Sequence, residues 1–584
     1  MALVDRASSC LIFPIAIVVA MIAGCAQPLH IVHDGKFHPA ECRNGRWRDA
    51  GVVPDIRDHV IAVDGQGRPH DPMMLNGEAM KLKDYRSRLA EIFASMRHFH
   101  ESHPGRKVLV FVHGGLNSPA DSLMAADNEI ERIMDAGYYP IFLNWDSDLL
   151  DTYREHATSV TQGRTEDGGR VLLTPFYIFA DAGRALTRAP VVWSNQLGSD
   201  LTAAGADLDA LAKHNAESAS SNSPDSSKER WANRPEAKAV EQALNNLKDR
   251  QRNDEARADP NAPRQEMRIY IGPDFDVNGG HLAGLGISYA ITSPTKFGLS
   301  WLIDGLGSPA WENMSRRTLV SFDGDFAGNP AEFESTQEKG LPREKRARSA
   351  INYTTVGAME VFREELLRAT RFSAGGDDAE GTAGQPYEIT LIGHSMGTMV
   401  LNEWLRRDIL EQRHQFYTNI VYMAAACSVR DFSRAVVPYL LLHGPDPDSK
   451  NPGEVLGTQF YSLMLHPLAD LRERERGYDI PPRGSLLVWL DDFLTDPQTP
   501  LDRTLGRWDN IIPAIDLIPQ SVRGQVSLKA FALAPYDDPI PPCGQPDYGP
   551  QAHGQFRDRP YWLPEFWYSE SPIMQKPNSA SIPK

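Results

Sequence analysis

The chain has 584 residues, with 60 Lys or Arg against 77 Asp or Glu, so its formal net charge is −17 at pH 7. This acidic balance repels phosphate backbones and anionic headgroups, and it argues against nucleic acid as a partner. Length alone predicts about four domains, but the motifs found along the chain favour fewer.

The N-terminal residues predict a targeting signal. Residues 11–22 are apolar but form a shorter run than a membrane-spanning helix needs, and they lead into Ile-Ala-Gly-Cys at 22–25. This pattern resembles the lipobox of bacterial lipoproteins, which implies that residues 1–24 are a signal peptide and that Cys25 is acylated. Ala26 after the cysteine then implies sorting to the outer membrane, facing the periplasm. A plain secretory signal or a transmembrane anchor is the alternative.

An N-terminal extension, residues 25–84, precedes the first regular elements. Apolar residues at helical spacing predict an amphipathic helix over 85–99. Continuous apolar runs predict buried strands over 107–112 and 138–145. The cluster of His98, His100 and His103 fits cationic side chains at a helix C-terminus better than a metal site, because its offsets spread the rings around the helix.

Residues 151–349 interrupt this pattern and are interpreted as a large insertion. Within it, 214–267 is rich in polar and charged residues and predicts a disordered linker. The apolar, aromatic segments 171–180 and 297–303 are equally compatible with the underside of a lid and with packing on the core. The glycine-rich segment 279–286 is interpreted as a flexible loop.

The most informative segment follows the insertion and a predicted helix over 358–371. A predicted strand over 389–392 leads into Gly-His-Ser-Met-Gly at 393–397, and residues 398–407 have the apolar spacing of a helix. A strand, a sharp turn flanked by glycines and a helix form the context in which a serine becomes a nucleophile. Ser395 is therefore the candidate nucleophile.

Together with Phe-Val-His-Gly at 111–114, followed by Gly115, this segment resembles the esterase and lipase-like members of the α/β-hydrolase superfamily. The resemblance covers about 85–150 and 350–569. It implies an α/β fold, a mostly parallel sheet flanked by helices, and a Ser–acid–His triad in that order. It also implies an oxyanion hole made by the N–H groups of Met396 and Gly115, with Leu116 in reserve.

The triad histidine is expected after the last core strand, predicted over 525–533, where His553 alone remains. The acid has more candidates. Asp491, Asp492 and Asp496 follow a predicted strand over 485–490, and Asp431 follows one over 419–424. We choose Asp492, because a residue just past a strand end reaches the carboxyl edge of the sheet, with Asp431 as runner-up.

The sequence thus predicts a serine hydrolase that cleaves carboxylic esters, small or lipid, without a metal or organic cofactor. The alternative is a non-catalytic envelope lipoprotein that uses the same fold as a binding scaffold. Acyl transfer and peptide hydrolysis with the same triad also stay open. A Cys42–Cys543 disulfide is possible in an oxidising compartment, and residues 570–584 are predicted to be a flexible tail.

Overall fold

The structure is a computed structural model that describes residues 55–72, 79–103, 105–115, 119–147, 149–158, 160–161, 164–165, 174–218, 267–272, 279–324, 356–370, 387–411, 416–444, 457–473, 484–534 and 548–568. Nine strands form one mostly parallel sheet in the order β2-β1-β4-β3-β8-β9-β10-β11-β7. The predicted α/β class is confirmed. The structure divides into two compact units: the Ser395 unit draws on residues 51–183 and 306–419, and the His553 unit on 184–305 and 420–584.

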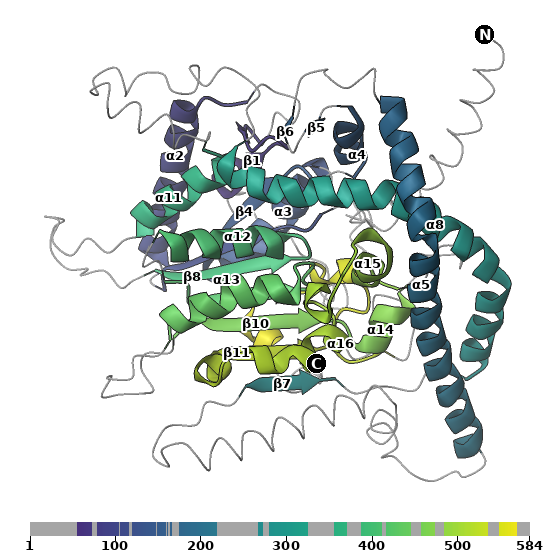
Figure 1. The fold of residues 1–584 in the computed structure, drawn as a ribbon. Helices are drawn as coiled ribbons and strands as arrows, with labels where there is room; N and C mark the ends of the chain where they lie inside the picture. The colour runs from purple at the N-terminus through teal and green to yellow at the C-terminus, as the bar shows by residue number, and fades with distance from the viewer. Residues whose placement is uncertain are drawn as a thin grey trace, which may run out of the picture. The chain divides into compact units, whose positions relative to one another are not determined.

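The Ser395 unit is built on parallel strands β4 (Tyr138–Trp145), β3 (Lys107–Val112) and β8 (Glu388–His394). β3 pairs with both neighbours, with Val112 opposite Leu143 on one side and Gly393 on the other. The residues that follow β3 and β8 are therefore neighbours at one edge of the sheet. Helix α12 (Gly397–Leu410) packs on these strands (Figure 1), burying Val400, Leu401, Trp404 and Leu405 as their helical spacing predicts.

Two strands within the N-terminal extension were not predicted. β1 (Val60–Val63) runs parallel to β4, and β2 (Pro69–His70) pairs antiparallel with β1. Asp64 shapes the turn between them, because its Oδ1 accepts the N–H groups of Gln66 and Arg68. The unit is completed by the end of α8 and by helices α2 (Leu82–Ser102), α3 (Pro119–Asp135), α4 (Leu149–Thr158) and α11 (Ala358–Thr370). Helix α2 confirms the helix predicted over 85–99.

In the His553 unit, β10 (Gln459–Met464) pairs in parallel with β11 (Val526–Ala530), which pairs in parallel with β7 (Arg268–Ile271). β9 (Asn419–Met423) leads into helix α13 (Val429–Leu442). The strand predicted over 485–490 is wrong: these residues form α15 (Leu486–Trp489), which continues as a π-helical turn over Leu490–Leu494. β10, which was not predicted, is the strand that precedes this region.

The predicted insertion contains two long helices, α5 (Thr174–Ser218) and α8 (Gly279–Asp323), with edge strand β7 between them in the chain. The prediction of a loop over 279–286 is wrong, since these residues begin α8. Of the predicted linker 214–267, residues 214–218 complete α5, Met267 precedes β7, and 219–266 lie outside the described residues. A short hairpin of β5 (Val160–Thr161) and β6 (Arg164–Thr165) precedes α5.

Candidate functional site

Ser395 occupies a strained turn between β8 and α12. Its φ angle is 50°, in the left-handed region that residues other than glycine rarely adopt. Among the described residues, only Arg106 and Ala424 share this property with it outside the glycines. Thr398 Oγ1 donates a 2.6 Å hydrogen bond to the Ser395 carbonyl and fixes the turn from inside the helix. Strain of this kind persists only where the surroundings impose it, and it is frequent at functional sites.

Glycines surround Ser395 because the backbones pass too close for side chains. A Cβ atom on Gly397 would lie 2.2 Å from the Val112 carbonyl oxygen, and one on Gly393 would lie 2.9 Å from Leu401 Cδ1. On the facing loop, a Cβ on Gly114 would lie 2.9 Å from the Cβ of Ser395. The turn after β8 is therefore seated directly against the loop after β3.

The loop after β3 also meets the first residue beyond the serine. A Cβ on Gly115 would lie 3.0 Å from Met396 Sδ and 3.4 Å from Met396 Cβ. Met396 caps helix α12, whose first N–H groups have no acceptor within the helix and carry its positive dipole end. Gly115 and Met396, both predicted site residues, are thus brought together beside Ser395, in an arrangement suited to stabilising a developing negative charge. Leu116 lies outside the described residues.

His113 anchors this loop. Trp145 N–H donates to His113 Nε2 at 3.0 Å, so Nδ1 bears the proton and donates to the Gly114 carbonyl at 2.6 Å. The indole of Trp145 stacks on the imidazole and donates to the His113 carbonyl at 3.1 Å. These contacts tie the glycine loop to the end of β4, a structural role of His113 that sequence reasoning missed.

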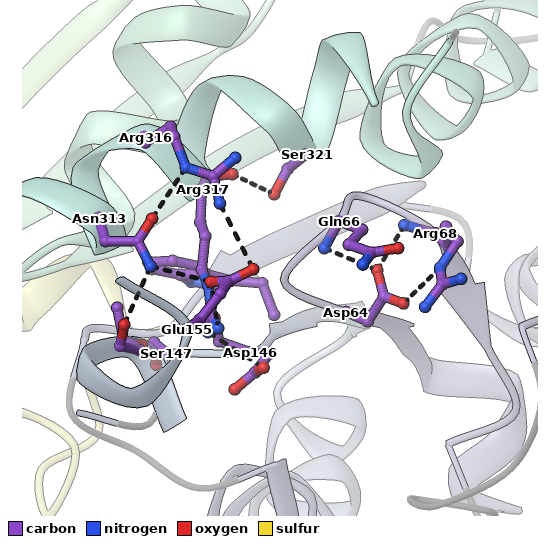
Figure 2. A network of polar contacts seen from close by, with 12 residues as sticks. Asp64, Gln66, Arg68, Asp146, Ser147, Glu155, Asn313, Arg316, Arg317 and Ser321 are labelled. Carbon is purple, nitrogen blue, oxygen red and sulfur yellow. Dashed lines mark hydrogen bonds and ion pairs between the residues drawn. The ribbon is translucent and has the colours of Figure 1, made fainter. Parts of the chain in front are cut away.

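Helix α8 packs against the glycine loop through Met314. Met314 is fully buried, and its Sδ lies 3.8 Å from a Cβ position on Gly115. The helix is held by ion pairs of Arg317, whose guanidinium meets Glu155 on α4 at 2.8 Å and Asp146 after β4 at 3.0 Å. Figure 2 shows Arg317 reaching from α8 to these carboxylates, with Asn313 donating to Glu155 beside it. This network fixes Met314 over the glycine loop.

The hydroxyl of Ser395 is buried, with 1% of the residue exposed, and its Oγ has no hydrogen-bond partner among the described residues. An unmade hydrogen bond in a buried site costs free energy. Such a group is suited to accept or donate a bond when another molecule enters. Position, strain and an available hydroxyl make this the clearest candidate site in the Ser395 unit.

The other predicted residues belong to the His553 unit. His553 begins a short 3-10 turn (His553–Phe556) and is buried, and its main-chain N–H donates to Glu473 Oε2 at 2.7 Å. Glu473 follows α14 (Pro467–Arg472), which directly follows β10. Sequence reasoning missed Glu473 because it missed β10 and because the alternating Arg and Glu residues at 472–476 are typical of a solvated charged face.

The predicted acids differ in their surroundings. Asp491 is buried and accepts bonds from Thr504, Arg507 and Asn510, so it is committed to holding this unit together. Asp496 is exposed. Asp431 is half-buried, in the first turn of α13, and shares hydrogen bonds with the N-cap residue Ser428. Asp492 is buried in the π-helical turn, and its carbonyl accepts a 3.4 Å bond from Asn195 on α5.

The remaining predictions concern the cysteines, metal binding and a membrane span. Cys25, Cys42 and Cys543 lie outside them. Within the described ranges, no three His, Cys, Asp or Glu side chains are placed to hold a metal ion. The same part of the chain contains no helix with both the length and the apolar character needed to cross a bilayer.

Comparison with known proteins gives no assignment: no family model, no curated protein and no solved structure matches this chain.

Proposed function

We propose that the chain is a serine hydrolase of the α/β-hydrolase type that cleaves carboxylic esters, with Ser395 as its nucleophile. The observation that carries the proposal is the φ angle of 50° at Ser395 between β8 and α12, with Gly114 packed against the serine Cβ. A strained serine at a strand–helix turn, facing a glycine loop from a neighbouring parallel strand, is the local geometry that ester hydrolysis by this chemistry requires.

In the proposed reaction, Ser395 Oγ attacks the ester carbonyl carbon, and His553 accepts its proton as general base. The resulting oxyanion accepts hydrogen bonds from the N–H groups of Met396 and Gly115, each worth about 3 kcal/mol of barrier. Collapse expels the alcohol, which takes the proton from His553, and leaves an acyl-enzyme. Water activated by the same imidazole then releases the acid.

Two carboxylates are proposed for orienting His553. Asp492 is the choice from sequence, although the strand that suggested it is a helix. Glu473 is favoured by a contact, because its carboxylate accepts the main-chain N–H of His553, and by its place after β10. The acid of a triad fixes the histidine tautomer and stabilises the imidazolium.

The proposed location rests on sequence alone: Cys25 is acylated and holds the enzyme at the outer membrane, facing the periplasm. Its substrates are small-molecule or lipid esters. The competing proposal is a non-catalytic envelope lipoprotein with a retained fold.

The decisive experiment is labelling of the purified protein with a fluorophosphonate probe, alongside hydrolysis of p-nitrophenyl esters. We expect Ser395→Ala to abolish both while the far-ultraviolet circular dichroism spectrum is retained. Ser122→Ala is the matched control, since Ser122 is a buried serine of the same unit whose Oγ also lacks a described partner. Equal labelling of wild type and Ser395→Ala would contradict Ser395 as the nucleophile, and no labelling of either protein would favour the scaffold.

The same assay separates the two acids. If Glu473 orients His553, Glu473→Gln lowers kcat by about 10⁴-fold, as loss of a triad carboxylate does, and Asp492→Asn changes it little. The reverse result assigns the role to Asp492.

A further inference from the structure

Between Thr174 and Gly198, the part of helix α5 whose side chains are described, the exposed face carries no charged residue. Phe176 and Phe179 are 71% and 72% exposed, and Leu186 is 64% exposed. Every exposed side chain described between Thr174 and Gly198 is uncharged, in a chain where Asp, Glu, Lys and Arg make up 23% of residues. The exposed positions are Phe176, Phe179, Ala180, Gly183, Leu186, Thr187, Pro190, Val191, Trp193, Ser194, Leu197 and Gly198.

Most of these positions lie on one line. Steps of three and four residues connect Phe176, Phe179, Gly183, Leu186, Pro190, Trp193 and Leu197, and such steps keep side chains on one face of a helix. At 1.5 Å per residue this stripe, here called the α5 stripe, is about 30 Å long. A surface helix of a water-soluble domain normally carries charged residues on its outer face, so the pattern is reversed.

The charged residues of this segment point elsewhere. Asp181 is half-buried, accepts a hydrogen bond from Tyr153 and lies 3.4 Å from His156 Nε2. Arg188 reaches Asp304 on α8 at 2.6 Å and the Thr495 carbonyl at 2.7 Å. Arg184 is half-buried as well. The polar face of α5 is therefore turned towards the protein.

We propose that the α5 stripe rests in the interfacial layer of a zwitterionic lipid surface. Phe, Trp and Leu are the side chains that enter this layer, and Trp is enriched there because its ring is amphipathic. Uncharged flanking positions offer no ion pair to a charged protein partner. The chain's net charge of −17 opposes anionic headgroups, which selects a zwitterionic surface over an anionic one.

A second copy of the chain fits this face less well. Helix pairing through three- and four-residue steps favours branched aliphatic residues along the seam and charged residues beside it. Here Gly183 and Pro190 occupy the seam, and Ala180, Thr187 and Ser194 lie beside it. The proposal also stands independently of ester hydrolysis, because no residue of the stripe belongs to the site around Ser395.

The first test measures contact of Trp193 with lipid. The full-length protein is added to phosphatidylcholine vesicles whose acyl chains are brominated, and tryptophan quenching is compared between wild type and Trp193→Phe. We expect a quenched component that Trp193→Phe removes. Quenching that is identical in the two proteins would overturn the proposal. Ser395→Ala is expected to retain the wild-type quenching, which separates this proposal from the hydrolase assignment.

The second test measures partition onto the same vesicles by flotation, with Cys25→Ser in every protein so that no acyl anchor contributes. Phe179→Asp with Leu186→Asp should weaken partition by about tenfold or more, since two large apolar side chains leave the interface. Leu410→Asp is the matched control, because Leu410 is 81% exposed but lies on α12. Equal weakening by the control, or none by the stripe variant, contradicts the proposal.

Two further readouts decide between occupants. Replacing part of the phosphatidylcholine with phosphatidylglycerol should weaken partition at low salt, and added salt should restore it; stronger binding to the anionic vesicles would contradict the charge argument. Light scattering reports the oligomeric state of the Cys25→Ser chain. A dimer that Leu186→Asp dissociates would assign the stripe to a second copy instead of lipid.

Discussion

Gly397 has no room for a side chain. We expect Gly397→Ala to push α12 away from β3, because the new Cβ would lie 2.2 Å from the Val112 carbonyl oxygen. The predicted result is a loss of about 1–3 kcal/mol of stability, typical of overpacking, together with loss of fluorophosphonate labelling. Thermal unfolding and the labelling rate measure the two effects.

Gly105→Ala is the control for this variant. A Cβ on Gly105 would make only ordinary contacts with Lys107, 3.7 Å away. If Gly397→Ala proved as stable and as reactive as Gly105→Ala, the close approach of the two backbones would be wrong.

Lys529 gives the His553 unit a dependence on pH. It is buried on β11, its Nζ donates to the Phe566 carbonyl at 2.7 Å, and burial lowers its pKa from 10.5 to about 8. The unfolded chain therefore holds this proton up to a higher pH than the folded chain does. The free energy of unfolding therefore rises between pH 8 and 10.5. Below pH 8 it is lower by about 3 kcal/mol, the cost of burying the protonated amine.

Lys529→Met should remove that component. The measurement is the free energy of unfolding across pH 7 to 10.5, with the variant curve flatter than the wild-type curve in this window. Lys107→Met, at a half-buried lysine on β3, is the matched lysine variant for comparison. A wild-type slope retained in Lys529→Met would show that another group titrates.

The strand, turn and helix around Ser395 could be predicted from the sequence because the relevant contacts are local or lie between adjacent strand ends. The glycines at 393, 397 and 114 are required by close backbone approach, and glycine is the residue that signals such approach in a sequence. Glu473 carries no comparable signal. Its relation to His553 arises from tertiary packing across a separation of about 80 residues, which no periodicity reports.

Among the elements, the segment after β10 shows how a short apolar run misleads. Leu-Leu-Val-Trp at 486–489 is compatible with a buried strand or a buried helix. Ser485 decides for the helix, because its Oγ accepts the N–H groups of Leu487 and Val488 as an N-cap. Strand β10 was not predicted because it is buried throughout although it contains polar residues such as Gln459 and Ser462, which interrupt the apolar run expected of a buried strand.

A buried ion cluster holds this segment in place. Arg507 donates to Asp470 and to Asp491, each at 2.9 Å, and all three side chains are almost fully buried. Burial opposes the charge of Arg507, but the two carboxylates outweigh it and raise its pKa above the ordinary value. The cluster connects α14, the π-helical turn and the loop before α16 (Trp508–Ile511).

Arg507→Met should therefore cost about 3–5 kcal/mol, because it leaves two buried carboxylates without their cation. Arg430→Met is the matched control, since Arg430 pairs with Asp502 at 2.7 Å where the two side chains keep 33% and 28% of their surface exposed. Chemical denaturation measures both. A similar small loss in the two variants would mean that the cluster does not stabilise the segment.

For the molecule as a whole, the sequence predicted the sheet class and the existence of an insertion, but not what the insertion builds. It supplies the edge strand β7 of the sheet and the wall over the glycine loop, through Met314 on α8. The hairpin of β1 and β2 packs on the same part of α8, since a Cβ on Gly67 would lie 2.2 Å from the Val320 carbonyl oxygen. Such long-range packing leaves no local pattern.

Arg317 tests whether this wall matters for reactivity. We expect Arg317→Met to lower the labelling rate of Ser395 by about tenfold or more, because α8 is released from Glu155 and Asp146 and small displacements at a reacting group are costly. Arg368→Met should have no effect, since Arg368 is 56% exposed and pairs on the surface of α11. An unchanged labelling rate in Arg317→Met would show that the ion pairs of α8 do not affect the reactivity of Ser395.

The contact between Gly397 and the Val112 carbonyl also sets an order of events during protein synthesis. The two residues are separated by about 280 residues, so a ribosome adding 5–20 residues per second needs roughly 15–60 s between them. Throughout that interval β3 has emerged without the neighbour that will cover one of its edges. A nascent chain of this kind needs protection from association until β8 arrives, whatever its finished form does.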